Sequence, residues 1–207
     1  MLDANLTAAR ERLGGGAALP ASSRVPVGAG FITGHKSVGL FSETALPIVK
    51  KHAPAAVWLF APEEHVKPHG AIIRALKGLD LPPAVFVQVG NVPSAREAAQ
   101  DGADVIVCQG IDAGGHQFRR GMGVVSLVPS VKAMLREEFP ERDIVLIGAG
   151  GIVNGDGVAA VMALGECARC VHRGVATDFL KALWVQLWER GYVLVMLMET
   201  EPLQCSC

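Results

Sequence analysis

The sequence predicts an α/β protein in which short parallel strands alternate with helices around one hydrophobic core. Apolar runs of five or six residues alternate with segments of helical periodicity, as in βαβ units. Glycine clusters follow two of these runs, where tight turns are required. Half of the 207 residues are hydrophobic and 19% are charged, which suits a single compact domain.

Five strands are expected, each a short apolar run of the kind that parallel sheets bury on both faces. The run at 85–89 (VFVQV) is typical, because β-branched and aromatic side chains favour strands. The expected strands are 26–31, 56–60, 85–89, 104–108 and 143–147.

Helices are expected between these strands. Pro93 lies in the first turn of one of them, and Gly102 follows its end, where a left-handed cap favours glycine. The expected helices are 42–51, 70–76, 93–99, one that carries Leu127, Val131, Met134 and Leu135 on one face, and 157–164. Five strands suit an open doubly wound sheet, whereas a closed barrel needs eight strands and typically ~250 residues, so spacing alone leaves both architectures open.

Composition excludes several classes of function. The net charge of −1, without a run of Lys or Arg, argues against a nucleic-acid partner. The N-terminus lacks the features of a secretory signal. The most apolar stretch, 192–198, has seven residues where a membrane span needs about 20. We therefore expect a soluble, cytoplasmic protein without a membrane partner. The five cysteines suggest no disulfide framework, and the spacing of Cys167, Cys170, Cys205 and Cys207 does not favour a metal site.

Two glycine-rich turns are the candidate ligand-binding segments. They span 109–116 (QGIDAGGH) and 148–157 (GAGGIVNGDG), and both follow strands at the carboxyl edge of the sheet, where ligands bind in α/β folds. Glycine lets backbone N–H groups approach an anion such as phosphate, with a helix N-terminus behind them. The alternative for either turn is ordinary tight-turn chemistry.

His116 is the candidate catalytic residue. It lies among glycines at the ligand edge, and an ordinary histidine pKa of about 6.5 suits a general base. The alternative is a solvated loop histidine. His65 and His69 are four residues apart and are interpreted as surface residues.

The segments 87–90 (VQVG), 109–116 and 147–155 (IGAGGIVNG) together resemble the nitronate monooxygenase family, also called 2-nitropropane dioxygenases. The resemblance is strong over 84–165 and is lost after Gly165. It implies an FMN-dependent TIM barrel of which strands three to seven are present, the first two are missing and the eighth is atypical. Residues 1–165 would form the partial FMN-binding barrel domain, and 166–207 its divergent C-terminal tail.

The resemblance also implies the chemistry. FMN would bind at the carboxyl rim, its phosphate held by the N–H groups of Gly150 and Gly151, with Gln109 and Gly114 beside the flavin. His116 would remove the α-proton of a nitroalkane or bind a nitronate, and dioxygen would be the oxidant, giving a carbonyl compound and nitrite. Two alternatives stay open: an FMN-dependent enoyl-thioester reductase, which shares these motifs, and a shortened fragment without catalysis.

The sequence pattern of the tail, residues 166–207, predicts two further elements of secondary structure. Apolar residues recur at helical spacing over 178–190, and 192–198 favours a strand. A barrel without its first strands leaves the sheet with two open edges, which favour homo-oligomers. The tail could cover one of these edges, but nothing in its sequence suggests that it closes the barrel.

Overall fold

The computed structural model describes residues 1–13, 23–62, 65–165 and 194–197. Six strands form one sheet in the order β5-β4-β3-β2-β1-β6. The strands are β1 (Val25–Ile32), β2 (Pro54–Phe60), β3 (Ala84–Val89), β4 (Val105–Gln109), β5 (Val145–Ala149) and β6 (Leu194–Leu197). The helices are α1 (Leu2–Leu13), the 3-10 helix η1 (Lys36–Leu40), α2 (Phe41–Thr44), α3 (Leu46–His52), α4 (His69–Lys77), α5 (Val92–Asp101), α6 (Val124–Glu138) and α7 (Gly155–Gly165).

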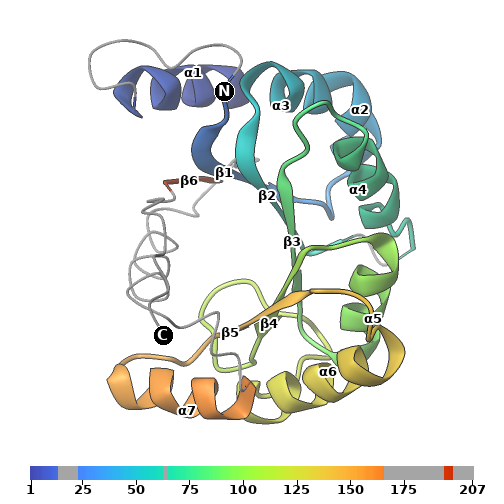
Figure 1. Ribbon diagram of the computed structural model, residues 1–207, viewed down its shortest axis with the longest axis vertical. Helices are drawn as coiled ribbons and strands as arrows, with labels where there is room; N and C mark the ends of the chain where they lie inside the picture. The colour runs from blue at the N-terminus through green and yellow to red at the C-terminus, as the bar shows by residue number, and fades with distance from the viewer. Residues whose placement is uncertain (14–22, 63–64, 166–193, 198–207) are drawn as a thin grey trace.

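The sheet is a partial (β/α)8 barrel. Strands β1 to β5 pair in parallel, each with the next in the chain, and a helical connection follows every one of them. The sheet curves into an arc, with α2 to α6 on its convex side (Figure 1). All five predicted strands are confirmed, with ends shifted by one or two residues. The resemblance therefore resolved the choice between barrel and open sheet correctly.

The strands bury different residues on their two faces, because successive side chains point to opposite sides. Val57, Val87 and Ile106 face the helices and join the largest hydrophobic cluster, which includes residues of α4, α5 and α6. Trp58 and Phe86 lie on the opposite, inner face, where a second cluster contains only strand residues. Each fully buried aliphatic side chain in these clusters contributes roughly 1.5–3 kcal/mol.

The helix predicted over 42–51 is divided in two. Helix α2 ends at Thr44, and α3 begins at Leu46 with Pro47 in its first turn. Proline has no backbone N–H to donate four residues back, so the regular hydrogen bonding is interrupted there. The cap at Gly102 is confirmed, with φ of 102°.

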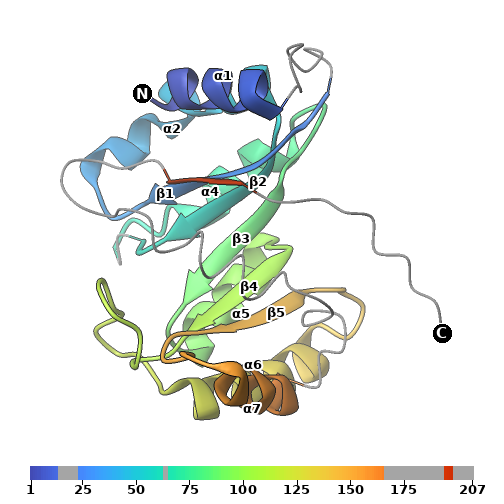
Figure 2. The same cartoon turned by 90° about the vertical axis from the view of Figure 1, so that its left-hand side faces the viewer.

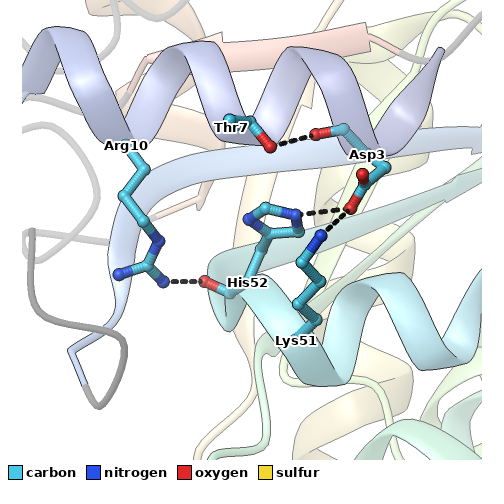
Figure 3. Close-up of polar contacts among 5 residues, drawn as sticks. All are labelled: Asp3, Thr7, Arg10, Lys51 and His52. Carbon is cyan, nitrogen blue, oxygen red and sulfur yellow. Dashed lines mark hydrogen bonds and ion pairs between the residues drawn. The ribbon is translucent and has the colours of Figure 1, made fainter. Parts of the chain in front are cut away.

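Helix α1 was not predicted from the sequence. Leu2, Leu6 and Ala9 are its buried residues, and they pack on β1. Polar contacts fasten it to α3, as Figure 3 shows. The carboxylate of Asp3 accepts hydrogen bonds of 2.8 Å from Lys51 Nζ and His52 Nε2, and these contacts hold the pKa of Asp3 below its ordinary value.

Arg10 makes a second connection between α1 and the rest of the fold. Its Nη2 donates to the carbonyl oxygens of His52 at 2.7 Å and Ser23 at 3.1 Å. The contact to His52 is visible beside the Asp3 contacts in Figure 3. The N-terminal helix is therefore held at both of its ends.

Residues of the tail cover the β1 edge, and β5 and β6 are the two edge strands of the sheet among the described strands. Strand β6 pairs antiparallel with β1, and Val27 lies opposite Leu197. In Figure 2, β6 lies along β1 at one end of the sheet and β5 lies at the other. The strand predicted over 192–198 is thus confirmed over its central residues, whereas the helix predicted over 178–190 lies outside the described residues. Strand β5 pairs only with β4 among the described strands.

No helix within the described part of the chain is long and apolar enough to cross a membrane. Cys108 is a free, buried thiol, and its burial raises its pKa to about 12. The other four cysteines lie outside the described residues.

Candidate functional site

The two glycine-rich turns lie against each other at the carboxyl edge of the sheet. They follow β4 and β5, which are parallel neighbours, and Gln109 pairs with Ala149 at the ends of these strands. The N–H of Gly110 donates a 2.8 Å hydrogen bond to the carbonyl oxygen of Ala149. Segments separated by about 40 residues in sequence therefore form one surface, as the sequence predicted.

Gly150 and Gly151 are required by backbone conformation and by close packing. Their φ angles are 95° and 74°, values that favour glycine. A Cβ on Gly150 would lie 2.9 Å from the Cβ of Ala113, and one on Gly151 would lie 2.7 Å from the Cβ of Asp112. Packing of one turn on the other is therefore one reason for these glycines, independent of any ligand.

The same glycines also fit an anion-binding role in part. Neither backbone N–H of Gly150 and Gly151 donates a hydrogen bond to another of the described residues. Two features work against a phosphate. Asp112 places an acidic side chain beside Gly151. Asn154 Oδ1 accepts a 2.9 Å hydrogen bond from the N–H of Gly157 and so caps the first turn of α7.

The loop that carries His116 is held over the strand ends by backbone hydrogen bonds. The N–H of Ile111 donates to the carbonyl oxygen of Met122 at 3.1 Å, and the N–H of Met122 donates to that of Gly90 at 2.9 Å. The ring of Phe118 covers Gly90, where a Cβ would lie 2.6 Å from its atoms. Phe118 also packs edge-on against Phe60, with ring centroids 5.6 Å apart.

His116 is exposed, as expected for a side chain that must reach a ligand. Gln109 is buried below it, only 7% exposed, and its Nε2 donates a 2.9 Å hydrogen bond to the carbonyl oxygen of His116. Gly114 lies in the same loop and is exposed. The structure thus brings Gln109, Gly114 and His116 together, beside the turn that contains Gly150 and Gly151.

His69 is a second histidine at this edge, and its interpretation as a surface residue was wrong. It is 7% exposed, and its Nε2 lies 2.7 Å from Thr33 Oγ1 at the end of β1. Burial lowers the pKa of His69 to about 4, partly offset by the charge of Glu97. The signal was present in the sequence, because His69, Ile72, Ile73 and Leu76 recur at the spacing of one helix face.

A small cleft of about 70 Å³ opens beside the His116 loop. His69, Gln88 and Phe118 line it, together with Lys67 and Glu97, whose Nζ and Oε1 form an ion pair at 3.1 Å. No group of side chains suited to a metal ion occurs among the described residues.

These features define a partial α/β-barrel protein with a candidate ligand site at the carboxyl edge of its sheet. The sequence model of the family described as nitronate monooxygenase matches residues 50–182, beyond the Gly165 at which the motifs end. A nitronate monooxygenase from Neurospora crassa is 47% identical over 174 residues, which cover 79% of this chain and 45% of that protein. The nitronate monooxygenase npaC of Metarhizium robertsii is 39% identical over 78% of this chain and 44% of its own. The chain belongs to the nitronate monooxygenase family.

The chain spans less than half the length of these two relatives. Among solved structures, FabK from Thermotoga maritima superposes with a TM-score of 0.53 at 24% identity, covering 77% of this chain and 50% of that one. This likeness supports the partial-barrel fold.

Proposed function

We propose that this chain carries part of the flavin and substrate site of an FMN-dependent nitronate monooxygenase, with His116 as its base. The observation that supports the proposal most is the placement of an exposed His116 on a loop that Gln109 holds and whose residues Asp112 and Ala113 pack on the glycine turn at 150–151. The family to which the chain belongs supplies the reaction class.

His116 would act on the proton of the substrate. A neutral nitroalkane has an acidic α-proton that a base must remove, whereas a nitronate is already an anion and needs only to be bound. An exposed imidazole above the strand ends can do either. FMN, when bound, supplies the redox chemistry with dioxygen that yields a carbonyl compound and nitrite.

The chain's own residues would hold the cofactor at two points. The N–H groups of Gly150 and Gly151, which donate to none of the described residues, suit the phosphate, provided that the Asp112 side chain turns away. Gln109 and Gly114 would border the flavin ring: Gln109 ends β4 and contacts the backbone of His116, and Gly114 lies on the loop that carries His116.

FMN titration of the purified chain tests this proposal. Quenching of flavin fluorescence should saturate near one FMN per chain, and the loaded protein should release nitrite from a nitronate salt. Substitution of His116 should lower turnover, and substitution of the exposed His65, remote from the loop in sequence, should not. NADH consumption with an enoyl thioester would indicate the reductase alternative, and absence of FMN binding would indicate a fragment without catalysis.

A further inference from the structure

We propose that Gln88 and Trp58 are positioning residues for His116, which they reach through a single row of hydrogen bonds across the inner face of the sheet. The row begins at Trp58 on β2, continues through Gln88 on β3 and Gln109 on β4, and ends at the backbone of His116. The role of His116 rests on the proposed function, whereas the row itself is a property of the fold.

Three bonds of equal length make up the row. Trp58 Nε1 donates to Gln88 Oε1, and Gln88 Nε2 donates to Gln109 Oε1, both at 2.9 Å. Gln109 Nε2 donates to the His116 carbonyl oxygen, again at 2.9 Å. Trp58 and Gln109 are 9% and 7% exposed, so water competes little for their groups, whereas Gln88 between them is half-buried and lines the cleft.

The strand register builds the row. Trp58 pairs with Phe86, and Gln88 is the next residue of β3 on the same face; Gln88 in turn pairs with Val107, and Gln109 is the next on β4. Each step therefore moves two residues toward the carboxyl edge. The stagger of neighbouring strands in a curved sheet produces such a diagonal, and it leads to the loop above the edge.

Only one direction of hydrogen bonding satisfies the row. An indole N–H can only donate, and a backbone carbonyl can only accept. Trp58 therefore requires the oxygen of Gln88 to face it, which turns the Gln88 NH₂ group toward Gln109. The NH₂ of Gln109 then faces His116. Each amide fixes the orientation of the next. A substitution at Gln88 therefore changes the hydrogen bond that the carbonyl oxygen of His116 accepts from Gln109.

The indole at the start of the row is fixed by stacking. Its ring lies 5.4 Å from that of Phe86, centroid to centroid, at an interplanar angle of 12°. A stacked, nearly buried indole has little freedom to rotate, so its N–H is a rigid starting point for the two flexible glutamine side chains.

The test combines a spectroscopic signal with loop cleavage, and neither needs flavin or turnover. His116–Gln117 is the only His-Gln pair in the sequence, so protein with ¹³C-carbonyl histidine and ¹⁵N-glutamine gives one peptide signal for this bond. Gln88→Met, close in size but without the amide, should shift that signal in the same direction as Gln109→Met. Gln100→Met, at an exposed position of α5, is the control and should leave it unchanged.

Trypsin cleavage after the exposed Arg119 and Arg120 reports how often the loop opens. Loss of about one net hydrogen bond should speed cleavage roughly five- to tenfold in Gln88→Met or Gln109→Met. The double variant should be little faster than either single one, because both break the same row. Trp58→Phe keeps the Gln88 amide but no longer fixes its orientation, so it should give a smaller rise in the cleavage rate. This variant replaces Gln88→Met in the test if Gln88→Met does not fold.

An unchanged His116–Gln117 signal in Gln88→Met, or additive cleavage rates in the double variant, would overturn the proposal. Failure of the wild-type chain to bind FMN or release nitrite would instead count against the proposed function and leave the row intact.

Discussion

The hydroxyl of Thr33 and the imidazole of His69 join the end of β1 to the start of α4, with Oγ1 and Nε2 2.7 Å apart. Thr33 Oγ1 also donates to the carbonyl oxygen of Phe60 at 3.1 Å, which uses its one proton and leaves Thr33 Oγ1 as the acceptor toward His69. The pair therefore requires a proton on Nε2, which a neutral imidazole with its proton there supplies as well as a charged one. Burial favours the neutral form.

The stability of the chain should fall in acid because of His69. Its pKa is about 4 in the folded protein, against 6.5 for an ordinary histidine, so between these values the unfolded chain binds a proton that the folded chain does not. The contribution is complete above pH 6.5, decreases as pH falls, and is lost below pH 4. It amounts to at most about 3 kcal/mol.

Urea unfolding at pH 7.5, 5.5 and 4.5 measures this dependence. His69→Asn should flatten the fall in unfolding free energy relative to the wild type, and the exposed His65→Asn should not. Parallel curves for wild type and His69→Asn would refute the assignment.

The two glycine turns should be sensitive to a single methyl group. Gly150→Ala forces a left-handed backbone on alanine and places its Cβ against Ala113, so we expect a loss of roughly 1–3 kcal/mol in unfolding free energy. Gly155→Ala is the matched control, because nothing lies within 4 Å of its added Cβ. Thermal unfolding compares the two, and equal melting temperatures would contradict the close packing.

Phosphate binding can be separated from packing at Gly151. Asp112→Asn removes the negative charge beside it without adding bulk, so FMN affinity should rise if this turn holds the phosphate. The unfolding free energy should change little, since the Asp112 side chain is exposed. Unchanged FMN affinity in a fluorescence titration would place the phosphate elsewhere.

His116→Asn should distinguish two classes of substrate. Turnover of neutral nitroalkanes should fall by at least about 100-fold, the effect of losing a general base. Pre-ionised nitronates should be affected far less, since they need no proton removed. Nitrite release from both substrates gives the comparison, and equal losses would make His116 a binding or structural residue.

The N-terminal helix should depend on Arg10. Arg10→Met retains much of the side-chain length but loses the bonds to the carbonyls of His52 and Ser23, so we expect about 1–3 kcal/mol lower stability. Arg12→Met, at an exposed position of the same helix, should have almost no effect. Amide exchange of α1 would show whether the helix loosens before the rest of the fold.

The sequence predicted the strands well because a strand buried on both faces is a continuous apolar run. It also predicted that the two glycine turns lie at the same edge of the sheet, since parallel strands place all their carboxyl ends at one edge. The row from Trp58 to His116 was beyond prediction, because the bond between Gln88 and Gln109 depends on strand register. Helix α1 was missed for a related reason: Asp3 and Arg10 bind partners on α3 that lie 49 and 42 residues away in the sequence.

Strand β6 also changes the character of one sheet edge. Among the described strands the sheet ends in β5 on one side and in β6 on the other, and each of these pairs with a single neighbour. The edge at β5 belongs to the parallel part of the sheet, whereas the edge at β6 is a strand of four residues that runs antiparallel to β1. A short edge strand offers few backbone groups to another chain, so β5 is the edge at which pairing with a second copy would form more hydrogen bonds. The two ends of the sheet are therefore unequal as sites of association.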